Sequence, residues 1–211
     1  MFSRREFLKN LLGICALPLV LSSQESKSKK YLVVYYTRTL NTQILSLFIQ
    51  RALGADLFAL ETLKPYPKDY DAMVALAAEE KRKGFCPPLL ALPNTKQYDV
   101  ILLGTPLWSL DISSPIKTFL IQSDLRGKIL IPFVTNAGYK FGNALDTIAK
   151  LVPQATTTNA FEHSFTLKEK TSRNLKVLNQ NKIIQNKEFE ILQQNKVQTW
   201  LKNLKGISNA I

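Results

Sequence analysis

The chain has 211 residues, of which 45% are hydrophobic and 21% charged, so it suits one globular domain and is not a disordered chain. Eight Gly and ten Pro show no collagen-like period, and two Cys are too few for a disulfide framework or a structural zinc site. Its 28 basic and 16 acidic residues give a formal net charge of +12, and residues 31–211 alone stay at +8, from 22 basic and 14 acidic residues.

The first thirty residues have the layout of an export signal. A basic stretch, SRREFLK at residues 3–9, precedes an uncharged run at residues 11–21 and a polar segment at residues 22–30. The uncharged run is far shorter than the roughly 20 apolar residues that a membrane span needs, and no other segment is long and apolar enough. The paired arginines resemble the bacterial twin-arginine signal, which implies export of a folded protein to the periplasm. An ordinary secretion signal or an uncleaved anchor is the alternative.

Residues 31–211 are expected to form one domain of alternating strands and helices, which is typical of a parallel sheet covered on both faces. Short apolar runs predict five strands, at residues 31–36, 56–61, 100–104, 129–135 and 156–161. Helical periodicity predicts five helices, at residues 41–53, 70–83, 115–123, 142–151 and 188–204. The apolar runs lack strict alternation, as expected of strands buried on both faces. The sequence therefore predicts a three-layer, doubly wound α/β fold. Tyr70 and Trp200 are predicted to be core or helix-face residues.

Most of the positive charge of the domain lies near its end. Nine basic and three acidic residues fall between residues 163 and 211, and residues 162–187 are predicted to form a polar, basic surface excursion. Nucleic acid is not favoured as a partner, because these lysines are interleaved with Asn and Gln rather than clustered on a helix. Solvated surface, an acidic partner and an anionic membrane face remain open.

In an open parallel sheet, ligands bind beyond the carboxyl ends of the strands, where the winding order reverses. The loop after the first strand, TRTLNT at residues 37–42, carries hydroxyl, amide and guanidinium groups directly before a helix. Such groups at a helix start favour an anion of phosphate size. The loop lacks the glycines of a nucleotide-triphosphate loop or a dinucleotide turn, so a single phosphate monoester is the better match. A simple Thr or Asn helix cap is the alternative.

Two further loops bring aromatic residues to the same edge of the sheet. The loop after the third strand runs from Gly104 to Pro115 and contains Trp108, and the loop after the fourth contains Tyr139. A planar ring held between aromatic walls and tethered by a phosphate would suit such a site. These features describe flavin mononucleotide (FMN).

The sequence resembles the flavodoxin-like FMN proteins over most of residues 31–161. The matching segments are TRTLNT at 37–42, YPKDY at 66–70, YD at 98–99, GTPLW at 104–108, PIKTFL at 115–120, DLRGK at 124–128 and PFVT at 132–135. The resemblance implies the strand order 2-1-3-4-5. Leu40 stands where the family usually has Gly, so its side chain must point away from the phosphate or the loop must follow another path.

The resemblance also implies which residues bind FMN. The phosphate would be held by Thr37, Arg38, Thr39, Asn41 and Thr42. The isoalloxazine ring would lie along Pro106, Leu107 and Trp108. The loop that closes the other side would contribute Thr135, Asn136, Gly138, Tyr139 and Gly142.

The sequence has neither the Ser/His/Asp order of a hydrolase nor a cluster of metal ligands, so the redox chemistry of a flavin is the expected activity. We expect electron transfer to or from a redox protein or a quinone in the cell envelope, and quinone reductase activity is one form that it could take. The alternative is a flavodoxin fold that has lost FMN and acts as a binding module through its basic C-terminal segment.

Overall fold

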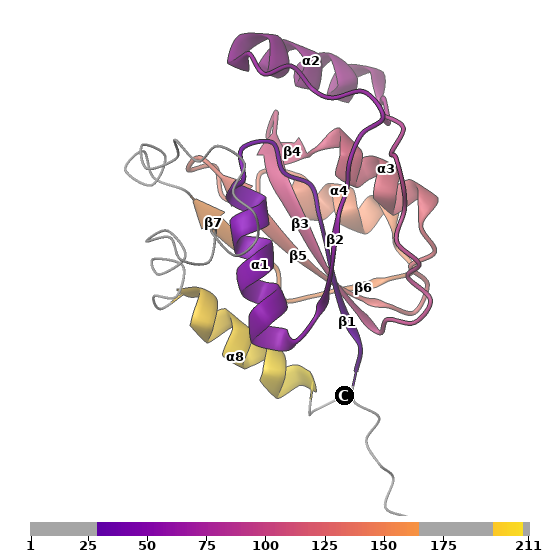
Figure 1. Ribbon diagram of the computed structural model, residues 1–211, viewed down its shortest axis with the longest axis vertical. Coiled ribbons are helices and arrows are strands. Elements are labelled where there is room, and N and C mark those ends of the chain that lie inside the picture. Colours follow the sequence, from indigo (N-terminus) through magenta and orange to yellow (C-terminus); the bar gives the residue numbers. More distant parts are fainter. Residues whose placement is uncertain (1–28, 165–195, 209–211) are drawn as a thin grey trace, which may run out of the picture.

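The computed structural model describes residues 29–164 and 196–208, which form a central sheet with helices on both of its faces (Figure 1). The strands are β1 (Tyr31–Tyr35), β2 (Asp56–Ala59), β3 (Val100–Trp108), β4 (Asp111–Ile112), β5 (Ile129–Asn136), β6 (Thr156–Thr157) and β7 (Phe161–Ser164). The helices are α1 (Asn41–Leu53), α2 (Tyr70–Lys83), α3 (Ser114–Gln122), α4 (Ala144–Leu151) and α8 (Lys196–Ser208). Within this described part of the chain, no helix is both long and apolar enough to cross a membrane.

The main strands are parallel and follow the order β2-β1-β3-β5-β6. This is the expected order 2-1-3-4-5. The short hairpin strand β4 lies off this path, so β5 and β6 are the fourth and fifth strands of the expected order. The predicted doubly wound fold is therefore confirmed. The winding direction reverses between β1 and β3, which places the switch point where the loops after these strands begin.

The sheet is buried on both faces, so neighbouring side chains of one strand enter different cores. On β1, Val33 packs in the core that α1 and α8 cover, whereas Val34 packs in the core under α3 and α4. Trp200 of α8 is buried as predicted, since its ring stacks on Phe161 at 4.6 Å and its Nε1 donates a hydrogen bond of 2.7 Å to the carbonyl of Asn159. Helix α8 thus closes the α1 face.

The prediction of one continuous fifth strand at residues 156–161 is wrong. The chain forms β6 beside the start of β5 and β7 beside its end, and both pairs are parallel. Between them Asn159 has φ +48°, which breaks the extended run. Strand β7 also occupies the start of the predicted excursion at 162–187. The rest of that excursion, the first turns of the helix predicted at 188–204 and the export signal up to residue 28 lie outside the described residues.

The prediction that β3 ends at Gly104 is also wrong, because the strand continues to Trp108 and turns back into β4. Ser109 and Leu110 at the turn have φ +48° and +61°, as a two-residue hairpin of type I′ requires. That turn usually contains Asn or Gly, and neither marks it in this sequence. Trp108 is consequently held at the end of a paired strand rather than on a loop.

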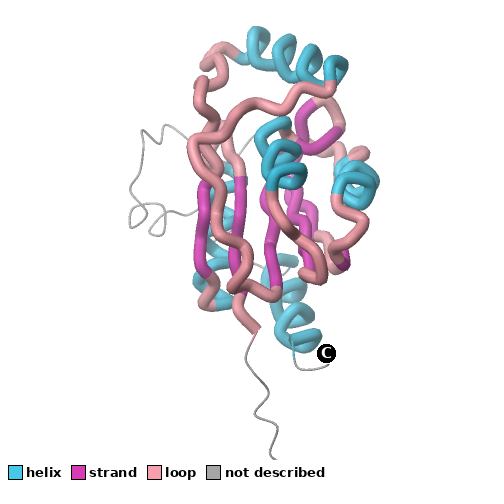
Figure 2. The backbone as a smooth tube through the Cα atoms, turned by 90° about the vertical axis from the view of Figure 1, so that its right-hand side faces the viewer, coloured by secondary structure: helices cyan, strands magenta, loops and turns pink. Residues whose placement is uncertain are grey.

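Helix α2 takes an unusual position. It lies beyond the carboxyl ends of the strands, whereas α1, α3, α4 and α8 flank the sheet (Figures 1 and 2). Only three of its residues are buried: Met73, Ala77 and Glu80. The helix therefore faces the edge of the sheet at which the ligand-binding loops are predicted to meet.

Candidate cofactor site

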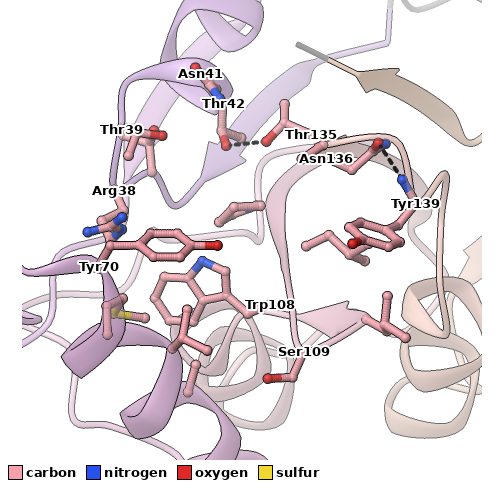
Figure 3. A pocket seen from close by; sticks show the side chains of 18 of the residues that line it. Arg38, Thr39, Asn41, Thr42, Tyr70, Trp108, Ser109, Thr135, Asn136 and Tyr139 are labelled. Atoms are coloured by element: carbon pink, nitrogen blue, oxygen red, sulfur yellow. Dashed lines mark hydrogen bonds between the residues drawn. The ribbon is translucent and has the colours of Figure 1, made fainter. Parts of the chain in front are cut away.

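A cavity of about 850 Å³ opens at this edge of the sheet (Figure 3). Its lining comes from the loop after β1, from α2, from the β3–β4 hairpin and from the loop after β5. The residues that line it are Thr37, Arg38, Thr39, Leu40, Asn41, Thr42, Tyr70, Met73, Val74, Ala77, Pro106, Leu107, Trp108, Ser109, Leu110, Thr135, Asn136, Ala137 and Tyr139. The structure thus brings the three predicted loops together and adds α2 as a fourth wall.

The loop after β1 presents polar groups that the protein itself leaves unpaired. Helix α1 begins at Asn41 with no side chain capping its first N–H groups. The Oγ1 atom of Thr37 and the Oδ1 atom of Asn41 are buried and have no hydrogen-bond partner within the described residues. A buried polar group without a partner costs about 1–3 kcal/mol, so this loop is shaped for a ligand that can bond to it. The alternative of a simple Thr or Asn cap does not match this geometry.

Leu40 keeps the backbone path that a glycine would take. Its φ is +67° and it stands at the N-cap of α1, while its side chain packs against the core beneath that helix. The left-handed conformation costs a leucine roughly 1–2 kcal/mol, and the apolar contact offsets part of that cost. Leu40 thus keeps the glycine-like path at the start of α1, and its residue both packs against that core and belongs to the cavity lining.

The first and third loops are joined at the floor of the cavity. The hydroxyl groups of Thr42 and Thr135 share a hydrogen bond of 2.8 Å, and both residues are buried. Ser46 donates a further hydrogen bond of 2.6 Å to the carbonyl of Thr42. Because both hydroxyl groups are engaged within the protein, this pair sets the distance between the loops and forms a rigid base.

Two tyrosines pack against Trp108 and hold its ring in place. Its ring meets Tyr36 edge-on at 5.4 Å and Tyr66 at 4.9 Å. The hydroxyl of Tyr66 donates a 2.8 Å hydrogen bond to Oε2 of Glu80, which is itself buried. Burial, together with this carboxylate, raises the pKa of Tyr66 far above its ordinary value, so the tyrosine stays protonated and remains a donor. The Trp108 wall is therefore preorganised.

Asn136 organises the loop after β5. Its Oδ1 accepts hydrogen bonds from the backbone N–H groups of Gly138 at 2.7 Å and Tyr139 at 3.1 Å, while its Nδ2 donates to Glu162 at 2.9 Å. Of the predicted site residues, only Gly138 and Gly142 are absent from the cavity lining. Both have positive φ, and a Cβ at Gly142 would lie 2.5 Å from the carbonyl oxygen of Leu110. These glycines shape the loop, and Tyr139 contributes its ring to the cavity.

The wall formed by α2 was missed by the sequence reasoning, which placed Tyr70 in the core or on a helix face. Tyr70 is 68% exposed and lines the cavity, and the guanidinium of Arg38 lies 5.9 Å from the centre of its ring. Met73, Val74 and Ala77 follow it along the same wall. The signal was the topology itself, because β2 ends at the same edge of the sheet and α2 is the next element.

Among the described residues that line the cavity, Arg38 is the sole charged one, and none of them has a carboxylate. Arg38 is anchored by a 3.3 Å hydrogen bond from its Nη1 to the carbonyl of Lys68. The nearby Asp111 accepts hydrogen bonds from Ile112 and Thr147 and lies 3.8 Å from Nζ of Lys81. The local field therefore favours an anionic ligand at the loop after β1.

Comparison with protein families shows to which family the chain belongs. The family model for flavodoxin matches residues 30–179, which is most of the chain. The chain belongs to the flavodoxin family. FMN is the cofactor of flavodoxins, so the expected cofactor is confirmed at the level of the family.

Solved structures share the fold of this flavodoxin. A candidate flavoprotein from Bacteroides eggerthii DSM 20697 is 24% identical over 74% of this chain and 93% of its own, with a TM-score of 0.58. A flavoprotein from Lactobacillus acidophilus NCFM, solved in complex with FMN, is 20% identical over 69% of this chain and 97% of its own, with a TM-score of 0.57. No curated protein matches the chain.

The cavity of this flavodoxin has the chemistry that FMN needs. The unpaired Thr37 hydroxyl can donate to a phosphate oxygen. The amide of Asn41 can donate to the phosphate or accept from a ribityl hydroxyl, since its oxygen and nitrogen exchange when the group turns over. Trp108 and Tyr139 supply aromatic surface on separate elements for a planar ring. The residues present therefore fit the cofactor of the family.

Proposed function

We propose that this protein binds FMN in the cavity at the carboxyl ends of β1, β3 and β5 and transfers electrons through it. The observation that carries the proposal is the pair of buried, unpartnered polar atoms, Thr37 Oγ1 and Asn41 Oδ1, at the uncapped start of α1. Bound FMN would supply one- or two-electron redox chemistry. The protein would bind the cofactor, orient it and set the charge around it.

Each group of residues has a distinct part in this proposal. Thr37, Thr39 and Asn41, with the first N–H groups of α1, would hold the phosphate, and Arg38 would balance its charge. Pro106, Leu107, Trp108 and Tyr139 would flank the ring, as their place in the cavity lining supports. The Thr42–Thr135 pair and Asn136 act as positioning residues, because their hydrogen bonds hold the loops.

The proposal is tested by loading the purified protein with FMN and recording its visible spectrum. We expect a yellow protein with one FMN per chain. The Thr37→Ala, Asn41→Ala double variant should bind FMN at least tenfold more weakly, because two buried partners of the ligand are lost. Thr156→Ala is the matched control, since Thr156 is exposed on β6 at the opposite end of the sheet. A colourless protein that takes up no added FMN would support the alternative of a cofactor-free binding module.

We also propose that the protein is exported through the twin-arginine route and exchanges electrons with a partner in the cell envelope. Support comes from the SRREFLK stretch before the uncharged run, and from the need of an FMN protein to acquire its cofactor before export. Replacing both Arg4 and Arg5 by Lys should leave the protein in the cytoplasm in its yellow form. Fractionation of cells followed by immunoblotting measures this, and unchanged export of the double variant would contradict the route.

A further inference from the structure

The α2 side of the cavity carries an unusual cluster of exposed apolar residues. Tyr70 and Val74 on α2 are 68% and 46% exposed, and Leu110 on the hairpin is 49% exposed. All three line the same cavity. Exposed apolar side chains that gather around a concave surface mark a ligand site more often than the same residues scattered singly. Tyr70 and Val74 come from α2, outside the three loops that the FMN proposal uses, whereas Leu110 comes from the hairpin after β3.

Hydrogen-bond donors lie among these apolar groups. In Figure 3 the ring of Tyr70 extends from α2 into the cavity beside the indole of Trp108. The hydroxyl of Tyr70 and the indole nitrogen of Trp108 both point into the open space, and Ser109 adds a hydroxyl on the lining. Because none of the described residues in the lining has a carboxylate, this region offers donors and apolar contact to a ligand that is flat and accepts hydrogen bonds.

The wall is held in place from both ends of α2. At its start, the Arg38 guanidinium lies over the Tyr70 ring at 5.9 Å. At its end, Glu80 accepts from Tyr66, and Nζ of Lys81 donates a 2.7 Å hydrogen bond to the carbonyl of Ser109. These contacts tie α2 to the phosphate loop, to the support of Trp108 and to the hairpin. The space between α2 and the hairpin is therefore preformed.

We infer that this space is a second ligand site for a planar, apolar molecule with carbonyl acceptors, of the quinone class. The inference rests on the proposed function, because FMN must occupy the part of the cavity beside Trp108 and Tyr139. A quinone matches the lining, since its ring suits the apolar walls and its two carbonyl oxygens suit the donors. The mixed charges of Lys68, Asp69 and Asp71 around Tyr70 select neither an acidic protein nor an anionic membrane, both of which need a more uniformly basic surface.

The test is to titrate the oxidised, FMN-loaded protein with menadione and to measure the binding by isothermal titration calorimetry. We expect saturable binding that Val74→Asp weakens at least about tenfold, because the variant places a charge against the apolar ligand. The matched control is Ala75→Asp, which adds the same charge to the next residue of α2, at an exposed position outside the cavity lining. Its affinity for menadione should stay within about twofold of the wild type.

A second pair of measurements separates hydrogen bonding from apolar contact. Tyr70→Phe keeps the ring and removes the hydroxyl, so it should weaken the binding of menadione about three- to tenfold. The affinity for 2-methylnaphthalene, which has no carbonyl group, should stay unchanged. The visible spectrum of each variant reports whether FMN is retained.

The outcomes distinguish the two proposals. A yellow protein with no saturable menadione binding overturns the second site and leaves FMN binding intact. Equal affinity in Val74→Asp and the wild type, or menadione binding that added FMN abolishes by competition, also overturns it. A protein that takes up no FMN overturns both proposals.

Discussion

Thr39→Asp is expected to raise the dissociation constant for FMN about 100-fold while changing the affinity for riboflavin less than threefold. Thr39 is exposed in the loop before α1 and lines the cavity, so the substitution adds a carboxylate without disturbing the core. A carboxylate about 5 Å from a phosphate dianion costs roughly 3 kcal/mol at a partly solvated site. Riboflavin lacks the phosphate and therefore reports any change in the ring site alone.

The same substitution should act in the opposite direction on stability. A negative charge just before α1 interacts favourably with the helix dipole, so without FMN the variant should be more stable by about 0.3–1 kcal/mol. Thr156→Asp adds the same charge to β6, at the other end of the sheet, and should leave the affinity for FMN unchanged. Raising the salt concentration should reduce the FMN defect of Thr39→Asp, because exposed charges are screened.

The affinities for FMN and for riboflavin are measured by quenching of flavin fluorescence, and their ratio is compared between the variant and the wild type. Equal losses for FMN and riboflavin would show that the loop had been deformed rather than charged. An unchanged affinity for FMN would mean that its phosphate does not lie at the start of α1, and the proposed orientation of the cofactor would be wrong.

Local sequence signals predicted the helices well where caps were present. Helices α1 and α2 have the predicted bounds, because Gly54 and Gly84 end them in the left-handed conformation with φ +64° and +63°. Asp69 also caps α2, since its side chain accepts a hydrogen bond from the N–H of Ala72. These features depend on residues close in the chain, which a sequence displays directly.

The features that the sequence did not predict depend on contacts between distant segments. The hairpin turn is made by Ser109 and Leu110, whose positive φ is supported by the hydrogen bond from the N–H of Asn143 to the carbonyl of Leu110. The division of the last strand similarly follows from pairing with β5 at two separate places. Neither pattern is visible in local propensity, because tertiary pairing overrides it.

The candidate site was predictable in its loops but not in its fourth wall. The Thr37 to Thr42 segment and Trp108 lie at predictable strand ends, and the structure places them in one cavity. Tyr70 was predicted to be a core or helix-face residue because its periodicity matches such a position. Its actual place follows from α2 standing beyond the sheet, held by Glu80 and Lys81. Lys81 contacts Ser109, 28 residues away in the chain, and a contact of that span leaves no local trace in a sequence.

Gly104→Ala is expected to lower the free energy of unfolding by about 3 kcal/mol, as overpacking of a closed core can do. Gly104 lies on β3, paired with Tyr35 on β1 and with Phe133 on β5. A Cβ atom there would stand 2.3 Å from Cζ of Phe133 and 2.8 Å from Cβ of Tyr35. Phe133 is fully buried, so its ring has no free space into which to move.

The matched control is Gly127→Ala, which separates this steric effect from the conformational cost of losing a glycine. Gly127 has φ +68° and nothing within 4 Å of an added Cβ, so its substitution should cost only about 1 kcal/mol, from the left-handed backbone. Gly104 has no positive φ, and its larger loss would come from the contact with Phe133 and Tyr35 alone. Denaturant unfolding of the two cofactor-free variants measures the difference. Equal losses would mean that Phe133 moves aside and that close packing at Gly104 does not restrict β3.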